Sequence, residues 1–470
     1  MSRVEVRADA RRSLVTGLGV VLSAALAATL FLAPGDPRPG TDRVRLEAAS
    51  NPITPGDFTG HGFDQCQAPK QSAMDSWMTS SPFLAVGIYI AGASRGCRNQ
   101  TYLNATWVRT QLAKGWKLLP ITLGPQASCN PRFPRYGDDS TINPDPANSY
   151  YRARMQGRRQ ATWSVNAATK LGIVPGSTLF YDLEGFDFDN TRCRESALWF
   201  LNGWTSVVHK HHYKSGVYSS AASGIKALDN ARVYRPGHFP QLPDQLWIAD
   251  WDGKANTSSA YVRSDGWQPH KRAKQYRGGH NETWGGVTIN IDRDWVDLGR
   301  GSYAAKVTHC GGVNVTFDHY YPVKPPTKNS KPNPSVVKAL KCLLKERGSF
   351  GGKLTGDYGS GLMHAIKDWQ RKHHMYVNPI FGRKNWMSLH ATNAHPVLKL
   401  GSAGERVRDL QRALDAVDVR LHLPVTGVFN AATRDALADY QASLGWKRTG
   451  IAQSWTWNAL LKGKYGGPLT

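Results

Sequence analysis

The segment from residue 57 to 300 alternates between short apolar runs and longer stretches with helical periodicity. Ala105–Gly115, Tyr150–Gly172 and Arg194–His212 carry apolar residues at three- and four-residue intervals, which is typical of helices. The strand-like runs are 61–64, 85–90, 118–122, 178–182, 215–218, 246–250, 273–276 and 287–292. Eight short strands with helices between them predict an α/β fold, a closed (β/α)8 barrel of the TIM type. A doubly wound sheet is the alternative.

Beyond the barrel segment, the sequence repeats itself at a spacing of 70 to 71 residues. Trp369-Gln370 matches Tyr440-Gln441, and Trp386 matches Trp457. Each copy reads as three short helices joined by loops that contain glycine. The repeat therefore predicts two small all-α three-helix domains.

The first 34 residues read as an export signal. Several arginines precede an apolar run from Leu14 to Ala33, which predicts a signal peptide or a single membrane anchor. Small residues around Ala25–Ala27 offer a cleavage site, and Arg11-Arg12 resembles a twin-arginine signal. No second hydrophobic segment follows, so we expect a secreted or wall-associated protein that contacts a membrane only if this segment is retained.

These observations divide the chain into six predicted parts. Residues 322–334 are rich in proline and lysine, so we expect them to form an extended linker. The parts are a signal or anchor (1–34), a spacer (35–56), the barrel (57–303), the linker (322–334), a first repeat (335–392) and a second repeat (396–464).

The charge favours an anionic partner. There are 59 Lys and Arg against 35 Asp and Glu, a formal net charge of +24. Such a balance is typical of proteins that meet nucleic acid, membrane surfaces or acidic wall polymers. The excess is spread over the chain and no nucleic-acid-binding motif accompanies it, so we predict no nucleic acid partner.

Acidic residues stand at four of the predicted strand ends. Catalytic groups of a barrel sit at the C-terminal ends of its strands. Residues two apart in a strand share a face, so Asp182 and Glu184 should both face the mouth. Crowding raises the pKa of one carboxyl while others stay ionised, the division of labour that glycoside hydrolysis needs. The catalytic candidates are Glu184, Asp182, Asp64 and Asp292.

Other interpretations of these acids stay open. Strand-end acids can simply cap the following helices, and Asp250 and Asp252 can be ordinary loop acids. Carboxylate clusters also bind Mg²⁺ or Ca²⁺, whereas zinc normally adds His, which the strand ends lack. We predict no metal and no cofactor.

Aromatic and polar residues surround the acids and suit a glycan cleft, because sugar rings stack on aromatic faces. Part of this set can equally be barrel core, where aromatic side chains are common. The candidates for substrate binding are Tyr89, Tyr218, Trp247, Asp250, Gln275 and Tyr276.

The six cysteines of an exported chain predict three disulfides, although six cysteines allow 15 pairings. The barrel hypothesis narrows the choice. Loops after neighbouring strands bring Cys66 near Cys97 and Cys129 near Cys193. The remaining pair, Cys310 and Cys342, would then join the barrel exit to the first repeat.

The barrel segment resembles the glycoside-hydrolase-like domain of unknown function found in secreted actinobacterial proteins. The segments that carry the resemblance are His61–Cys66, Val86–Gly92, Gly216–Ser220, Trp247–Gly253 and Gln275–His280. That family is similar to the family-25 lysozymes, which are (β/α)8-type barrels. Such a fold does not by itself imply activity.

The lysozyme Asp-x-Glu motif corresponds to Asp182-Leu183-Glu184, and the strand-one and late-strand acids correspond to Asp64 and Asp292. The resemblance implies that Glu184 is the general acid and that Asp182 orients the substrate or stabilises charge. Asp64 and Asp292 would support them.

The repeats resemble the peptidoglycan-binding domain common on wall hydrolases. The second copy matches better, through Leu400–Gln411, Thr426–Phe429 and Trp455–Trp457. The first copy has Lys341-Cys342 where the second has Gln411-Arg412. The two resemblances together imply a lysozyme-like hydrolase tethered to peptidoglycan or another wall glycan. A non-catalytic wall-binding protein on an inactive barrel is the alternative.

Overall fold

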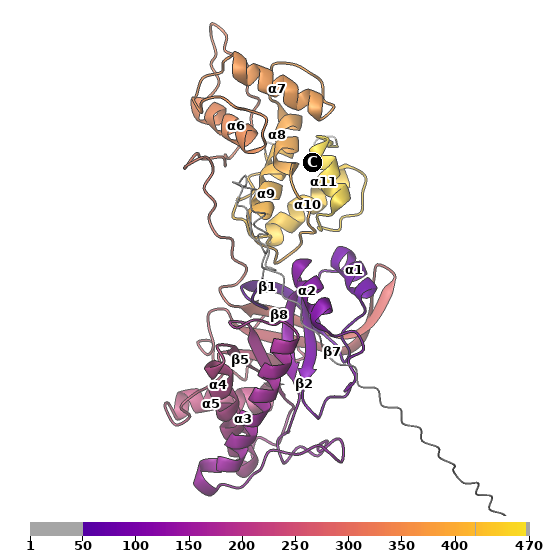
Figure 1. The fold of residues 1–470 in the computed structure, drawn as a ribbon, viewed down its shortest axis with the longest axis vertical. Helices are drawn as coiled ribbons and strands as arrows, with labels where there is room; N and C mark the ends of the chain where they lie inside the picture. The colour runs from indigo at the N-terminus through magenta and orange to yellow at the C-terminus, as the bar shows by residue number, and fades with distance from the viewer. Residues whose placement is uncertain (1–49, 419, 467–470) are drawn as a thin grey trace, which may run out of the picture. The chain divides into compact units, whose positions relative to one another are not determined.

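The computed structural model describes residues 50–418 and 420–466, and its first part is a closed barrel of eight strands in sequence order (Figure 1). The predicted barrel is thereby confirmed. Its strands are β1 (Phe58–Asp64), β2 (Ala85–Ala91), β3 (Lys117–Thr122), β4 (Thr178–Leu183), β5 (Lys214–Ser220), β6 (Gln245–Ala249), β7 (Lys271–Trp284) and β8 (Val287–Leu298). Strands β2 to β4 are buried along almost their whole length, as expected where side chains fill a barrel and helices cover it.

A helix follows each of the first five strands. These helices are α1 (Gln71–Ser80), α2 (Ala105–Ala113), α3 (Ala147–Lys170), α4 (Thr191–Lys210), and the π-helical turn η1 (Ala221–Ile225) continued by α5 (Lys226–Tyr234). Asn104 and Asn190 cap α2 and α4, because each side chain accepts a backbone N–H of the first turn. The helices predicted at 105–115, 150–172 and 194–212 are α2, α3 and α4.

The end of the barrel departs from the expected alternation. Strands β1 to β7 are parallel, but β8 runs antiparallel to both β7 and β1. Only Gly285 and Gly286 separate β7 from β8, with φ of 56° and 76°. Two residues with positive φ make a hairpin turn, and such a short turn forces antiparallel pairing. The expectation that strand eight ends at Asp292 is therefore wrong: Asp292 lies inside β8.

All three predicted disulfides are present. Cys66 bonds Cys97 between the loops that follow β1 and β2, and Cys129 bonds Cys193 between the loop after β3 and the first turn of α4. Cys310 bonds Cys342. Thr54, in the predicted spacer, is fully buried, and its hydroxyl donates to the Leu118 carbonyl. The chain thus joins the barrel before β1 begins.

The C-terminal part contains six helices within residues 334–461, in two sets of three (Figure 1). They are α6 (Pro334–Glu346), α7 (Ser360–Lys372), α8 (Arg383–Ala391), α9 (Glu405–Val417), α10 (Ala431–Ser443) and α11 (Ser454–Leu461). Val323, in the predicted linker, is buried and exchanges backbone hydrogen bonds with Phe381. That end of the linker therefore belongs to the helical core.

The repeated residues play the same part in each copy. Gln370 is buried and donates to the Ile380 carbonyl, while Gln441 is buried and donates to the Ile451 carbonyl. Each amide holds the loop between the second and third helix of its repeat. The repeated glutamine is therefore explained by its hydrogen bond to this loop. The repeated tryptophans, Trp386 and Trp457, are fully buried in the helical core.

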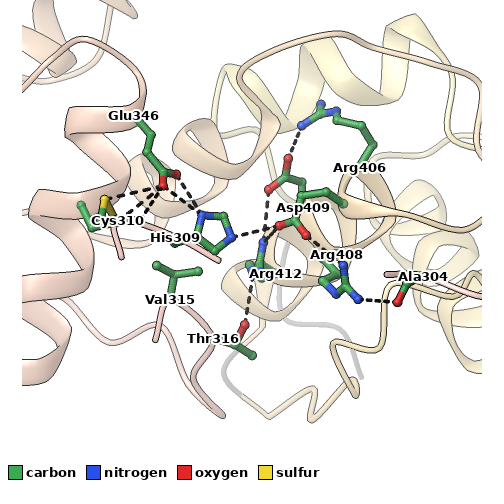
Figure 2. Close-up of polar contacts among 12 residues, drawn as sticks. Ala304, His309, Cys310, Val315, Thr316, Glu346, Arg406, Arg408, Asp409 and Arg412 are labelled. Carbon is green, nitrogen blue, oxygen red and sulfur yellow. Dashed lines mark hydrogen bonds and ion pairs between the residues drawn. A yellow bond between two sulfur atoms is a disulfide. The ribbon is translucent and has the colours of Figure 1, made fainter. Parts of the chain in front are cut away.

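A charged cluster joins the two repeats at α6 and α9 (Figure 2). His309 Nδ1 lies 2.9 Å from Glu346 Oε2, and its Nε2 lies 3.3 Å from Glu405 Oε1. Arg412 donates to the same Glu405 oxygen at 2.6 Å. Both ring nitrogens face carboxylates, so the imidazolium with two donors fits best. Hydrogen bonding to Glu405 and Glu346 raises the pKa of His309.

Across the described ranges, no helix is both long and apolar enough to span a membrane. The predicted signal or anchor, its twin-arginine motif and most of the spacer lie outside the described residues.

The His309 cluster predicts a pH-dependent stability. The folded-state pKa of His309 is raised, so its contribution is complete below about pH 6.5, the pKa of an unfolded histidine, and is lost as pH rises through the folded-state value. We expect His309→Gln to lower Tm more at pH 6 than at pH 9, with a pH-dependent part on the order of 1 kcal/mol. Calorimetry of the full chain measures this, and His211→Gln, at an exposed position, is the control. An equal loss at both pH values would contradict an imidazolium here.

Candidate active site

The predicted catalytic acids meet at one end of the barrel. Asp64 is the last residue of β1, Asp182 is near the end of β4, and Glu184 follows that strand. Asp292 comes to the same end because β8 is antiparallel, and it pairs in register with Asp64. The i, i+2 rule also applies to β8, where it adds Asp294, an acid that the sequence analysis missed.

Asp64 and Asp292 lie opposite each other on β1 and β8, and each affects the pKa of the other. Burial, followed by the charge of Asp292, raises the pKa of Asp64 well above its usual value. Burial raises the pKa of Asp292 to about 6, and a hydrogen bond from Asp64 opposes that rise. These directions agree if Asp64 keeps its proton and donates it to the Asp292 carboxylate. Near neutral pH the pair then presents one partly exposed negative charge at Asp292.

Asp294 lies fully buried below this pair. The Trp247 indole N–H donates to its Oδ1 at 2.9 Å. Burial, then the charge of Asp64, raises the pKa of Asp294. Trp247 itself is completely buried against Phe180 and Tyr218, so it supports the acids from the core.

Asp182 is held in place by Tyr89, whose hydroxyl donates to Asp182 Oδ2 at 3.1 Å. Burial, and then the charge of Glu184, raises the pKa of Asp182 well above its usual value. Within the described residues its other oxygen, Oδ1, is buried without a hydrogen-bond partner. A buried oxygen in this state is suited to a ligand hydroxyl or a proton.

Glu184 is fixed through its backbone and left partly free at its side chain. Gln126 accepts the Glu184 backbone N–H at 2.7 Å and donates to the Asp182 carbonyl at 2.8 Å. Arg132 donates to Glu184 Oε2 at 3.1 Å, and the side chains of Arg132 and Glu184 are 66% and 25% exposed. A pair this open to solvent contributes little, about 0–1 kcal/mol, so an entering ligand can displace Arg132.

Gln275 is the central polar side chain of the site. It is buried, donates to Asp64 Oδ2 at 2.9 Å, and accepts from the Tyr218 hydroxyl and the Trp251 indole N–H, each at 2.9 Å. Trp251 is 66% exposed. It therefore offers an open aromatic face beside the acids, which Trp247 does not.

Among the described residues, two further predicted substrate-binding residues form no side-chain hydrogen bond with the catalytic candidates. Asp250 accepts a hydrogen bond from Ser259 within its own loop. Tyr276 is buried beside Arg293 and Glu282. Of the other predicted substrate-binding residues, Tyr89 and Gln275 donate to catalytic acids. Tyr218 donates to Gln275, and Trp247 donates to Asp294 from the core.

One group in the described chain has the spacing of metal ligands, Cys310, Cys342 and Glu346. Its sulfur atoms form a disulfide and so are not thiolate ligands.

Protein-family models match the barrel and both C-terminal repeats. Residues 75–296 match the Rv2525c-like, glycoside hydrolase-like domain, and residues 333–389 and 403–460 match the peptidoglycan binding domain. The chain thus carries a glycoside hydrolase-like domain followed by two peptidoglycan-binding domains, which is the composition of a cell-wall-directed protein. Together with the three disulfides, this combination of domains indicates an extracellular or cell-wall location.

Several solved structures are similar to part of the chain. An uncharacterized B. stearothermophilus protein is 17% identical, with 50% of this chain and 95% of that chain covered and a TM-score of 0.32. The Mycobacterium tuberculosis Tat-secreted protein Rv2525c, in complex with L-tartrate, is 14% identical, with 51% and 95% covered and a TM-score of 0.33. The catalytic domain of endolysin ply40 from the Listeria monocytogenes bacteriophage P40 is 12% identical, with 51% and 93% covered and a TM-score of 0.30. No curated protein matches the chain.

The role of Gln275 can be tested by its removal. We expect Gln275→Leu to lower the free energy of unfolding by about 2–3 kcal/mol, because Asp64, Tyr218 and Trp251 each lose a partner. Urea unfolding followed by tryptophan fluorescence measures the loss. Gln67→Leu removes one exposed hydrogen bond to a backbone carbonyl and should change stability by less than about 0.5 kcal/mol. Equal effects of both substitutions would contradict the central position of Gln275.

Proposed function

We propose that the protein is a secreted glycoside hydrolase of the lysozyme type that acts on peptidoglycan, with the C-terminal repeats holding it on the wall. The observation that carries the proposal is the cluster of carboxyls with separated protonation states at one barrel end. Asp64 and Asp182 have raised pKa values, while Asp292 ionises near pH 6. Glycosidic cleavage needs a proton donor beside an ionised carboxylate. The family matches support peptidoglycan as the substrate.

Glu184 is the proposed proton donor to the leaving glycosidic oxygen, and the protonated Asp182 beside it would supply the proton that Glu184 passes on. It is only partly buried, its backbone is fixed by Gln126, and its ion pair with Arg132 is open to solvent. Asp182 would receive a sugar hydroxyl or acetamido group at its unpartnered oxygen. Asp292, ionised and supported by Asp64, would stabilise the oxocarbenium-like centre.

Attachment and export complete the proposal. Two wall-binding repeats on one chain keep the barrel at high local concentration over its polymeric substrate. The positive charge favours approach to anionic wall polymers, and this part of the attraction should weaken with salt. The N-terminal segment would direct secretion, with the twin-arginine route as one option.

A first experiment removes the proton donor. We expect Glu184→Gln to abolish the release of reducing ends from purified cell wall, a loss of at least about 100-fold, while sedimentation with the wall is unchanged. Asp189→Asn, an exposed acid five residues away, is the matched control and should keep full activity. Undiminished release by Glu184→Gln would refute its role. Wall binding without any release by the wild type would favour the non-catalytic alternative.

A second experiment follows pH. Because Asp292 must be ionised and its pKa is about 6, kcat/KM should fall as pH drops through 6. Initial rates on a soluble glycan fragment between pH 4.5 and 8 measure this acid limb. Activity that stays constant down to pH 4.5 is incompatible with this role for Asp292.

A further inference from the structure

The first repeat contains a cavity of about 490 Å³ between α6, α7 and the loop that joins them. Its walls include Lys341 from α6, Phe350 and Thr355 from the loop, and Gly359 at the start of α7. All lining residues lie between 341 and 368, so this cavity belongs to the first repeat alone.

Lys341 places a buried positive charge at this cavity. The residue is 5% exposed, and its Nζ donates to the Thr355 hydroxyl at 2.9 Å. In the part of the chain that the structure describes, no carboxylate forms an ion pair with it. Burial lowers the pKa of Lys341, and the more distant charge of Asp357 opposes the change. An ammonium has three donors, so this one has capacity and charge left for an anion.

The second repeat has a set of hydrogen bonds at this position that the first repeat lacks. Gln411 stands at the position of Lys341, donates to the Val428 carbonyl and the Thr433 hydroxyl, and accepts the Gly427 N–H. That amide ties the loop to both helices. Lys341 has no acceptor atom and cannot form the same set of bonds.

The two repeats also differ at the N-terminus of their second helix, where the first repeat again lacks a hydrogen bond that the second repeat has. In the second repeat, Asn430 caps α10 by accepting the Thr433 N–H at 3.0 Å. The first repeat has Gly359 and Leu362 at these positions, and no side chain among the described residues caps α7. The first turn of α7, which lines the cavity beside Lys341, therefore keeps free N–H donors and the positive end of its helix dipole.

The remaining charges restrict the ligand. Asp357 and Asp368 also line the cavity. Two carboxylates would repel a phosphate dianion, whereas a ligand with one carboxylate and a nearby ammonium satisfies both signs. A short peptide with a free carboxyl end and an amino side chain has this pattern.

We infer that the first repeat binds the terminal carboxylate of a short peptide through Lys341 and the N-terminus of α7, with Asp357 and Asp368 receiving a ligand ammonium. This inference rests on the proposed wall-binding role of the repeats, since peptidoglycan carries peptides of that kind. It gives the two repeats different tasks, with the peptide site in the first.

Calorimetric titration of the full chain with N-acetyl-Lys-D-Ala-D-Ala tests the inference. We expect saturable binding that weakens at least tenfold when the peptide acid is replaced by its C-terminal amide. Inorganic phosphate and chitotetraose are the competing probes. Equal binding of the acid and the amide would contradict recognition of the terminal carboxylate. Tighter binding of phosphate or of chitotetraose would contradict a peptide as the ligand.

Two substitutions replace residues of the proposed site with those found at the same positions of the second repeat. Lys341→Gln and Gly359→Asn introduce the residues found there, and a Cβ at Gly359 would meet nothing within 4 Å. Each should weaken binding at least tenfold while Tm stays the same or rises. Lys345→Gln, on the same helix and outside the cavity, should bind as the wild type does.

Unchanged binding by Lys341→Gln contradicts the inference. Because the titration uses a peptide without sugars, its failure would leave the release of glycan fragments by the barrel intact. Loss of glycan release with normal peptide binding would instead count against the proposed hydrolase.

Discussion

The candidate site depends on the burial of several carboxyls at one end of a closed barrel. Water would keep Asp64, Asp182 and Asp294 ionised, but burial makes the charged form unfavourable and raises each pKa. Neighbouring strands bring the acids close enough to interact, so their protonation states separate. The antiparallel β8 is essential to this arrangement, because it brings Asp292 opposite Asp64.

Much of the fold could be predicted from the sequence. Apolar runs ending in polar residues located all eight strands, and the order of the loops selected the disulfides. The direction of β8 was not predicted, although the two-residue Gly285-Gly286 turn carried the signal. The strand-end acids were found because position along a strand decides where a carboxyl lies. Asp294 was missed because its strand was expected to end too early.

The burial of individual side chains was harder to predict. Trp247 and Trp251 are four residues apart and chemically alike, yet one is fully buried and the other is mostly exposed. Contacts from distant loops, such as Gln126 and Arg132 on Glu184, also left no local pattern. Composition and periodicity describe single elements, whereas these contacts depend on how several elements pack.

The central claim is that Asp64 keeps its proton while Asp292 ionises near pH 6. Carbon-13 NMR of the protein labelled at aspartate carboxyls, with Asp64→Asn and Asp292→Asn for assignment, measures both groups in the free protein. The account predicts that the Asp292 signal titrates near pH 6 and that Asp64 remains protonated there. Ionisation of both carboxyls near pH 4, the usual value for aspartate, would contradict it.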